Sequence, residues 1–373
     1  MKKKIKVLHI FGGMNCGGAE TLIMNVFRNI DREVFCFDFA VQTQQKCFYD
    51  DEIEKLGGKI IHLPSPREKL FLYGNELKKA IENYGPYDVI HSHVHYFSGF
   101  ILKLAKSKDI PVRIAHSHNT YDGKKDSLIR NIYRIYMRIL IKNNATYLLG
   151  CSKAACESLF GKNCWIDERV RIVPNAIDLS PYENLPDKTI LRKKLHLPIN
   201  VPIVGHIGRF HPQKNHKFII EIFSELIKQI PSAHLVLVGD GPLRKDIEDL
   251  VKQKSIEKNV HFLGIRKDIP EILGALDVFL FPSLYEGLGI VLIEAQAAGL
   301  PCIVSDVIPN DVNIVKGLIE FISLDSDINY WISQIRKKLL QKPSFKIQGV
   351  SFLKKSGYNI SNTIESLSKI YSS

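Results

Sequence analysis

The stretch FPSLYEGLGIVLIEAQAAGLPCIVSD, residues 281–306, predicts a strand end, a turn, a helix and a second strand in succession. An apolar run, DVFLFPS, leads into the turn YEGLG, which contains two glycines. The segment from about Ile290 to Ala298 is apolar enough to form a buried helix, and Gly299-Leu300-Pro301 separates it from the apolar run CIVS. A strand, a helix and a strand in this order are typical of a parallel sheet.

Two carboxylates occupy this unit: Glu286 in the turn and Glu294 about one turn into the predicted helix. The turn lies at the carboxyl end of a strand, where open α/β sheets bind ligands. Gly287 and Gly289 let a ligand approach the backbone, and a helix start offers unpaired N–H groups to an anion. These groups suit a ligand that is both hydroxylated and phosphorylated, such as a nucleotide sugar. An ordinary strand–turn–helix unit with two exposed acids is the simpler alternative.

The composition is typical of a globular protein that binds an anionic partner. A chain of 373 residues, 45% hydrophobic and 24% charged, is long enough for two domains. No apolar run approaches the ~20 residues that span a bilayer, and we interpret the basic and apolar start, MKKKIKVLHIFGG, as a first strand rather than a signal peptide. A net charge of +12 predicts a polyanionic partner, and without a nucleic-acid-binding motif we expect that partner not to be nucleic acid.

The cysteines favour a reducing compartment. There are seven of them, with no C-x-x-C pair. An odd, scattered set of cysteines is typical of cytoplasmic proteins. We therefore expect a cytoplasmic protein.

Strands and helices alternate from the amino terminus onward, which predicts a doubly wound parallel sheet. Residues 6–11 form the first strand, and four glycines follow before a helix that starts near Ala19. A strand, a glycine loop and a helix together can hold a phosphate, so Gly17 and Gly18 are candidate contacts. The glycine spacing is not G-x-G-x-x-G, which argues against a dinucleotide site.

Five histidines lie at or beyond the ends of two predicted strands: His91, His93, His95, His116 and His118. Alternate residues of a strand share one face, so a metal site is geometrically possible. No Asp, Glu or Cys stands at a supporting spacing, and we expect no metal here.

Residues 124–142 form the clearest amphipathic helix of the chain. Its basic residues fall within about 120° of one another at 100° per residue: Arg130, Arg134, Arg138 and Lys142. Its opposite side is apolar: Leu128, Ile132, Ile135 and Ile139. We expect the apolar side to pack on the sheet and the basic face to meet solvent, an anionic membrane surface or the phosphates of an acceptor. Ile141 falls among the arginines, where it could enter the lipid headgroups.

The segment VRIVPNAIDLSPYENLP is a predicted linker, because it carries three prolines within 13 residues. It divides the chain into an amino-terminal domain, 1–178, and a carboxyl-terminal domain, 179–351. The second domain again has a glycine turn after its first strand, with Arg209 and Lys214 in that turn. Residues 307–324 have a weak pattern, and the last helix, within about 352–373, is expected to pack on the first domain.

Several of these motifs together resemble the retaining glycosyltransferases of family 4. The resemblance rests on the two glutamates separated by seven residues, on EAQAAGLPCIVSD and on VPNAID, and it spans almost the whole chain. It is most similar to the bacterial capsule and exopolysaccharide enzymes. Many relatives have Pro where this chain has Val291, which affects loop shape more than chemistry. The implied fold is GT-B, two Rossmann-like domains that face a central cleft.

The resemblance implies a role for each candidate residue. His116 or His118 lies beside the transferred sugar, and we favour His118. Arg209 and Lys214 are cations placed where charge grows on the leaving diphosphate. Glu286 binds a sugar hydroxyl and Glu294 binds the ribose. The remaining expected contacts to the base, phosphates and sugar are Gly208, Gly264, Ile265, Arg266, Gly287, Leu288, Gly289 and Ile290.

The implied reaction is transfer of a sugar, with retention, from a nucleotide-sugar donor to a lipid-linked saccharide acceptor, and we expect the donor to be a UDP-hexose or a UDP-N-acetylhexosamine. Because Arg209 and Lys214 are protein cations placed to meet the phosphates, we expect no metal or other cofactor. The enzyme is expected at the inner face of the cell membrane as a peripheral protein. A UDP-sugar epimerase of the same architecture, a basic nucleic-acid-binding protein and an NAD-dependent dehydrogenase are the alternatives.

Overall fold

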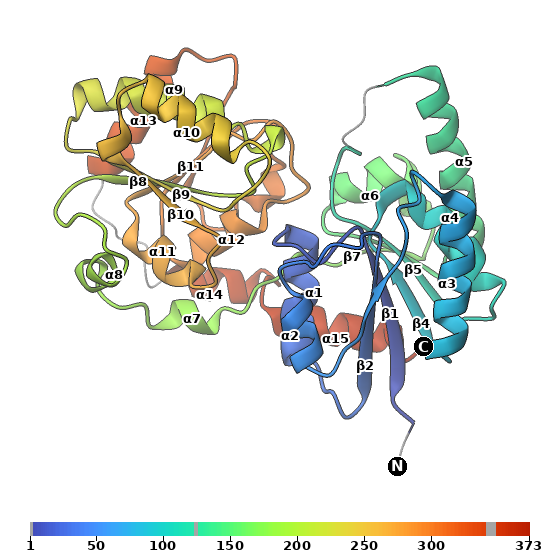
Figure 1. The fold of residues 1–373 in the computed structure, drawn as a ribbon. Coiled ribbons are helices and arrows are strands. Elements are labelled where there is room, and N and C mark those ends of the chain that lie inside the picture. The colour runs from blue at the N-terminus through green and yellow to red at the C-terminus, as the bar shows by residue number, and fades with distance from the viewer. Residues whose placement is uncertain (1–2, 123–125, 341–347) are drawn as a thin grey trace. The chain divides into compact units, whose positions relative to one another are not determined.

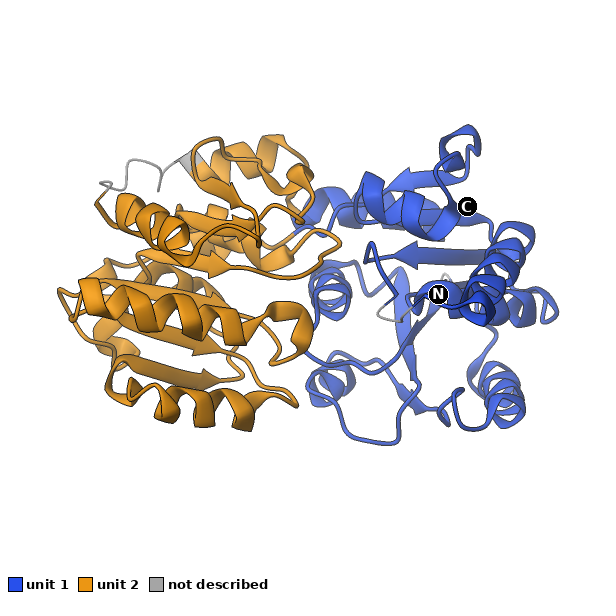
Figure 2. Ribbon diagram, turned by 90° about the horizontal axis from the view of Figure 1, so that it is seen from above, with its two compact units in different colours: residues 1–176, 360–373 blue, residues 177–359 orange. Residues whose placement is uncertain are grey.

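A computed structural model of the chain describes residues 3–122, 126–340 and 348–373 (Figure 1). The chain divides into two compact units (Figure 2). Unit 1 combines Met1–Ala176 with Ile360–Ser373, and unit 2 is Ile177–Asn359. The division falls two residues before the predicted boundary, and the segment that returns to unit 1 begins at Ile360 rather than at about 352.

Unit 1 is built on a seven-stranded parallel sheet with the order β3-β2-β1-β4-β5-β6-β7. The strands are β1 (Ile5–Phe11), β2 (Phe35–Val41), β3 (Ile60–His62), β4 (Val89–Ser92), β5 (Val112–Ser117), β6 (Tyr147–Gly150) and β7 (Val170–Ile172). The inner strands are nearly continuous apolar runs, such as IKVLHIF in β1, because helices cover both faces of the sheet. The order reverses between β1 and β4, and such a reversal opens a crevice for ligands.

Helices cover both faces of the first sheet (Figure 1). One face packs against α1 (Gly18–Asn29), α2 (Asp50–Lys55) and α15 (Ile360–Tyr371). The other packs against α3 (Leu70–Tyr84), α4 (Ser98–Lys106), α5 (Leu128–Asn144) and α6 (Lys153–Phe160). Short 3-10 turns follow β4 and α6: η1 (His95–Phe97) and η2 (Cys164–Ile166).

Unit 2 repeats this design with six parallel strands in the order β10-β9-β8-β11-β12-β13. The strands are β8 (Ile203–Ile207), β9 (His234–Val238), β10 (Val260–Gly264), β11 (Val278–Phe281), β12 (Cys302–Ser305) and β13 (Ile319–Ile322). The order reverses between β8 and β11. The stretch quoted first, residues 281–306, forms the end of β11, the turn, α12 and β12, as predicted.

The helices of unit 2 also lie in two layers (Figure 1). One layer packs on the core of the second sheet: α9 (His216–Gln229), α10 (Arg244–Gln253) and α13 (Ile328–Leu340). The other helices are α7 (Ser180–Glu183), α8 (Lys188–Lys194), α11 (Ile269–Ala275), α12 (Ile290–Ala297) and α14 (Gln348–Lys355). The 3-10 turns are η3 (Pro212–Lys214), η4 (Glu257–Asn259) and η5 (Asn310–Val312).

Two strands were not predicted. Residues 170–172, assigned to the linker, form β7 at the edge of the first sheet, and β13 lies within the weakly patterned segment 307–324. The prediction of two doubly wound halves is confirmed. In the part of the chain that the structure describes, no helix has both the length and the apolar character needed to cross a bilayer.

Helix α5 buries the opposite face from the one that we predicted to be buried. The predicted helix began at residue 124, and residues 124 and 125 lie outside the described ones. The residues that pack inward are Met137, Ile141 and Asn144. Gly99 of α4 makes this close approach possible, because a Cβ there would lie 2.6 Å from the Met137 carbonyl oxygen. The position of Ile141, which is fully buried, rules out the predicted contact with lipid headgroups.

The arginines of α5 are held by protein groups rather than by solvent. Arg130 and Arg134 both donate to the carboxylate of Asp122, with their closest contacts at 2.8 Å. Arg138 donates to the Leu159 carbonyl oxygen at 3.0 Å. The predicted solvated basic face is therefore wrong for these three residues.

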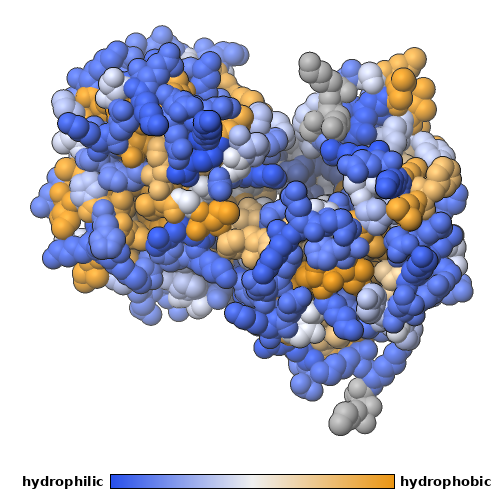
Figure 3. Space-filling view, viewed as in Figure 1, coloured by the Kyte–Doolittle hydropathy of each residue, from blue (hydrophilic) through white to orange (hydrophobic). Residues whose placement is uncertain are grey.

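The side of α5 that faces outward is apolar instead. Its exposed fractions are 78% for Leu128, 59% for Ile132, 58% for Ile135 and 50% for Ile139. Hydrophobic residues gather over this helix on the surface of unit 1 (Figure 3). We call Leu128, Ile132, Ile135 and Ile139 the α5 apolar stripe.

Candidate active site

The site in unit 2 is formed by the loops after β8 and β11, the two strands between which the strand order reverses. Backbone and side-chain hydrogen bonds join these loops. The Leu284 amide donates to the Gln213 carbonyl oxygen at 2.8 Å, and the Gln213 side-chain amide donates to the Tyr285 carbonyl oxygen at 2.9 Å. Asn215 donates to the Pro282 carbonyl oxygen at 3.2 Å. The two loops therefore form one rigid rim at the carboxyl edge of the sheet.

Lys214 and Glu286 form an ion pair across this rim. The Lys214 Nζ lies 2.5 Å from Glu286 Oε1, and the lysine also lies over the Phe281 ring at 4.5 Å from its centroid. Glu286 is buried, with 6% of its surface exposed. A buried carboxylate is costly without a partner, so the contact with Lys214 offsets the burial of Glu286 and each side chain orients the other.

Glycines bring the backbone close at this edge. Gly208 donates to the Val238 carbonyl oxygen at 2.9 Å, and a Cβ on Gly239 would lie 2.2 Å from the Gly208 carbonyl oxygen. Gly289 precedes α12 with a φ of 76°, a left-handed conformation that favours glycine. Helix α12 begins at Ile290, four residues after Glu286 in the sequence. The backbone amides of its first turn have no partner within the helix.

Glu294 lies on α12, and its environment favours the protonated carboxyl. Burial raises the pKa of Glu294 to about 7, and the hydroxyl of Tyr182 on α7 partly offsets this effect. The Tyr182 pKa is itself raised well above its ordinary value, first by burial and then by the Glu294 charge. No sequence pattern indicated Tyr182, because it stands in the predicted linker and meets Glu294 only through tertiary packing.

The remaining predicted residues of unit 2 have different surroundings. Arg209 is exposed near the start of the loop that follows β8. Arg266 is bound to Asp268 through hydrogen bonds of 2.8 and 2.6 Å, which orient its guanidinium. Gly264 has a φ of 68° and ends β10, and Ile265 after it is 46% exposed. Gly287 and Leu288 are buried beside Glu286 in the β11 loop.

In unit 1, Gly17 and Gly18 stand at the start of α1, after β1. Gly17 is the residue that precedes the helix, in an extended conformation, and accepts a hydrogen bond from the Thr21 amide at 2.9 Å. A Cβ on Gly17 would lie 2.3 Å from a Glu20 carboxylate oxygen, so the glutamate side chain folds over this glycine. The predicted helix start after the glycine loop is present, and its contact with a phosphate stays a prediction.

The histidines of unit 1 form one packed cluster with two hydrogen-bonded chains. One chain runs from the Tyr371 hydroxyl to His91 Nδ1, 2.8 Å, and from His91 Nε2 to His116 Nδ1, 3.1 Å. The other joins His9 Nδ1 to His93 Nε2, 3.2 Å, and His93 Nδ1 to His118 Nε2, 2.9 Å. His9, on β1, was not predicted to belong to this group.

Burial keeps these imidazoles neutral. It lowers the pKa of His9 and of His118 to about 3, and it lowers the pKa of His91, His93 and His116 well below the ordinary value. Neutral imidazoles can donate and accept hydrogen bonds to uncharged hydroxyl groups. His116 is fully buried and His118 is 9% exposed. The preference for His118 as the residue nearer the sugar stays a prediction.

The predicted residues thus form two groups, one in each unit. Lys214, Glu286 and the glycines after β8 and β11 come together in unit 2, whereas the histidines and Gly17 belong to unit 1. Each group lies at the carboxyl edge of its own parallel sheet, beside the strands where the order reverses. This edge is the ordinary ligand site of open α/β sheets.

Two family models match the chain. The model described as "Glycosyl transferases group 1" matches residues 187–343, and that described as "Glycosyltransferase Family 4" matches residues 16–181. The two matches lie mostly in unit 2 and in unit 1, respectively.

Individual relatives align over most of their length. A Bacillus subtilis (strain 168) protein named "Putative glycosyltransferase EpsF" is 38% identical over 89% of this chain and 87% of its own. An Escherichia coli protein named "UDP-Gal:alpha-D-GlcNAc-diphosphoundecaprenol alpha-1,3-galactosyltransferase" is 27% identical over 99% of this chain and 97% of its own.

Solved structures share the fold. The crystal structure of Anabaena Alr3699/HepE in complex with UDP and glucose superposes with a TM-score of 0.81 at 18% identity and covers 99% of this chain and 100% of that one. At this identity the likeness concerns the architecture, which is that of the GT-B fold, as predicted.

Proposed function

The chain belongs to the glycosyltransferases of group 1 and family 4, and on that premise we propose that it transfers a sugar, with retention, from a UDP-sugar to a lipid-linked saccharide. The E. coli relative is named for UDP-galactose and a diphosphoundecaprenol acceptor, and the structural neighbour holds UDP. These names support a UDP-hexose or a UDP-N-acetylhexosamine as donor. A Staphylococcus aureus relative named for capsular polysaccharide biosynthesis, 27% identical over 99% of this chain, supports a role in making a cell-surface glycan.

The observation that carries the proposal is the Lys214–Glu286 pair at the joined β8 and β11 loops. A diphosphate needs cations where the bond breaks, and a sugar hydroxyl needs an acceptor nearby. Lys214 supplies the first and Glu286 the second, and their contact fixes both before the donor binds. Arg209, exposed in the same loop, adds a second cation. Preorganised charge of this kind stabilises a transition state without reorganisation during the reaction.

The proposed reaction proceeds on one face of the sugar. The bond from the anomeric carbon to the β-phosphate oxygen breaks, and its electron pair stays on UDP. The acceptor oxygen forms its new bond from the same side, and its proton passes to the leaving phosphate oxygen. Arg209 and Lys214 meet the growing phosphate charge, so no metal ion is required. In unit 1, His118 or His116 contacts the sugar as a neutral imidazole.

Attachment to a membrane is part of the proposal, but through a different face from the predicted one. A lipid-linked acceptor lies in a bilayer, and the α5 apolar stripe offers exposed leucine and isoleucine side chains to it. An amphipathic helix can lie in the interface with its apolar side among the acyl chains. The excess of 12 positive charges attracts anionic lipid to the protein as a whole. We propose a peripheral protein at the inner membrane face.

The test is a thermal-shift panel of UDP-, GDP- and ADP-sugars, followed by product analysis with a diphosphate-linked lipid saccharide. We expect stabilisation by one UDP-sugar, and a product whose new linkage keeps the donor's anomeric configuration by NMR. An inverted linkage would disprove the retaining mechanism. Turnover of the UDP-sugar without an acceptor would identify an epimerase instead.

A further inference from the structure

Unit 2 contains a pocket that shares no lining residue with the loops after β8 and β11. It lies between α7, the carboxyl end of α12 and α14. Its volume is about 590 Å³, and sites for small molecules commonly measure ~300–1,000 Å³. The pocket is therefore large enough for one small ligand.

Two contacts join α14 to the other walls of this pocket. Gly349 lets the start of α14 lie against α12, because a Cβ there would be 2.2 Å from the Gln296 carbonyl oxygen. Near the other end of α14, the Lys354 Nζ lies 2.5 Å from a carboxylate oxygen of Glu183, the last residue of α7. These contacts set the spacing of the three helices around the pocket.

The inner surface of the pocket is apolar. Four buried side chains contribute to it: Tyr182, Ala297, Ala298 and Val350. Binding in such a place is favoured by the apolar surface that the ligand removes from water. The inner surface therefore suits the hydrocarbon part of a ligand.

The mouth of the pocket is polar and basic. Ser351, Lys354 and Lys355 line it and are exposed. Lys354 is paired with Glu183, whereas Lys355 takes part in no ion pair within the part of the chain that the structure describes. An ammonium group binds phosphate and carboxylate oxygens through charge-assisted hydrogen bonds. Lys355 and the Ser351 hydroxyl therefore suit an anionic head group.

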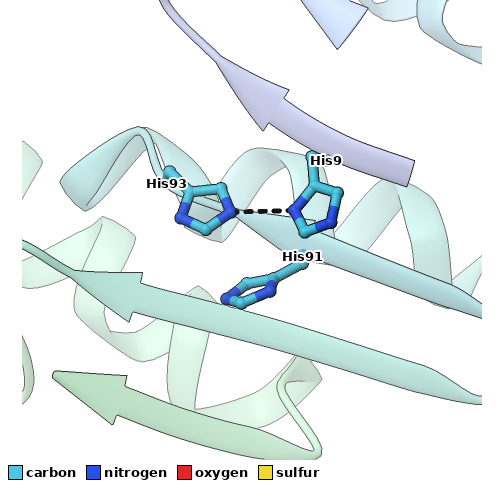
Figure 4. Close-up of side chains that lie close together, drawn as sticks. All are labelled: His9, His91 and His93. Atoms are coloured by element: carbon cyan, nitrogen blue, oxygen red, sulfur yellow. Dashed lines mark hydrogen bonds between the residues drawn. The ribbon is translucent and has the colours of Figure 1, made fainter. Parts of the chain in front are cut away.

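A second sugar or nucleotide matches this pocket poorly. A hydroxylated ligand needs polar side chains that lie together, as in unit 1, where the rings of His9, His91 and His93 form one group (Figure 4). On the inner surface of the pocket the polar group is the Tyr182 hydroxyl, which interacts with Glu294. The separation of an apolar interior from a basic mouth instead favours an amphiphile.

We propose that this pocket binds an amphiphile, a hydrocarbon chain that carries an anionic head group. The chain lies on the apolar inner surface, and the head group contacts Lys355 and Ser351 at the mouth. The site is additional to the proposed transfer reaction and independent of it, because none of its residues contacts the donor there. The same chemistry occurs in a free alkyl phosphate and in a lipid of the membrane.

The test is isothermal titration calorimetry of the full chain with butyl, hexyl and octyl phosphate, each below its micelle concentration. We expect one site per chain and an affinity that rises about 4-fold for each CH₂ group that is buried. Equal affinities for inorganic phosphate and octyl phosphate would overturn the proposal. Saturating UDP should not displace octyl phosphate, whereas displacement would place the probe at the donor loops and overturn it as well.

Two variants at the mouth test the place of binding. Ser351→Phe should fill the mouth and abolish binding of octyl phosphate. Lys355→Glu should weaken binding about 10-fold, since a repulsion replaces an exposed charge pair. Ser333→Phe and Lys337→Glu on α13 are the matched controls, because both residues are also exposed, and they should bind like the parent. Thermal midpoints verify each fold, and unchanged binding by Ser351→Phe would overturn the proposal.

A flotation assay with phosphatidylglycerol vesicles identifies the source of the amphiphile. If Ser351→Phe loses vesicle binding together with octyl phosphate binding, while Ser333→Phe keeps both, the pocket takes a lipid of the bilayer. If Ser351→Phe loses octyl phosphate binding alone, the pocket takes a free amphiphile. Either result supports the pocket as the binding site.

Discussion

The Lys214 ammonium nitrogen lies 2.5 Å from a carboxylate oxygen of Glu286, although 72 residues separate the two in the chain. The pair joins a cation suited to a diphosphate with an acceptor suited to a sugar hydroxyl. Because each partner is mostly buried, removal of either one leaves a charge without compensation. The pair is therefore part of both the stability and the proposed chemistry of unit 2.

Arg209→Ala tests the proposed chemistry separately from the stability of unit 2, because Arg209 is exposed. We expect kcat to fall by about 10²-fold or more, as when one transition-state donor is removed, with an unchanged thermal midpoint. Lys214→Ala should lose as much activity and also lower the midpoint, since Glu286 is left alone. Lys217→Ala, an exposed lysine in the first turn of α9, is the charge-matched control. Near-normal turnover of Arg209→Ala would contradict the proposed clamp.

The two glutamates should have separable roles. Glu294→Gln should weaken binding of UDP itself, because it removes the proposed ribose contact. Glu286→Gln should weaken binding of the sugar-bearing donor more than that of UDP. Isothermal titration calorimetry with both ligands measures the difference. Equal affinities for parent and variants would mean that neither carboxylate contacts the donor.

The raised pKa of Glu294 predicts a pH dependence of stability. The ordinary value is 4.5 and the folded value is about 7, so between them the unfolded chain has lost a proton that the folded chain retains. The contribution of this group to the free energy of unfolding therefore falls as pH rises through that window. Chemical denaturation across the window should show a smaller decline for Glu294→Gln. Identical slopes would place the Glu294 pKa near its ordinary value.

UDP binding should follow the opposite trend. A ribose hydroxyl donates more strongly to a carboxylate than to a carboxyl group, so UDP affinity should increase from about pH 6 to about pH 8. Titration of the phosphate itself contributes equally in the Glu294→Gln variant, which serves as the reference. A parallel increase in both proteins would exclude Glu294 as the cause.

The α5 apolar stripe predicts the face that meets a membrane. Ile132→Asp combined with Ile135→Asp should abolish binding to phosphatidylglycerol vesicles in a flotation assay, with UDP affinity unchanged. Ile190→Asp on α8 is the matched control, because Ile190 and Ile132 are both 59% exposed. Raised salt should weaken the parent's binding only in part, since apolar contacts are not screened. Undiminished binding of the double variant would place the membrane contact elsewhere.

Activity should persist in excess EDTA, because Arg209 and Lys214 meet the phosphate charge in place of an ion. The measurement is initial rate with and without chelator, at saturating donor. Loss of activity with EDTA and recovery with Mg²⁺ or Mn²⁺ would contradict the metal-free mechanism.

Periodicity and turn chemistry were enough to predict the β11–α12–β12 unit, because its strands are continuous apolar runs separated by glycine turns. The same signals missed β7, whose three residues are too few and too exposed to form an apolar run. They also misplaced α5. That helix has two apolar sides, and the packing of Met137 beneath Gly99 decides which one is buried. Only the tertiary structure shows which side of α5 is buried.

The candidate site, like the fold, was predicted only in part from the sequence. Glu286, Lys214 and the glycines were predicted, since strand ends and glycine turns are visible in the sequence. The contact of Tyr182 with Glu294 and the inclusion of His9 in the histidine cluster were not. Each depends on which elements become neighbours in space, and a pattern along the chain does not carry that information.

The interrupted sequence of unit 1 has a consequence for how the protein is made. Tyr371 of α15 packs on β1 and β2 and bonds to His91, so the first sheet lacks one of its covering helices until residues 360–371 have left the ribosome. Unit 2 is continuous, from Ile177 to Asn359, and its synthesis is finished before that of α15. Of the two units, the one that begins first is therefore completed second, and its histidine cluster is closed only after α15 has been synthesised.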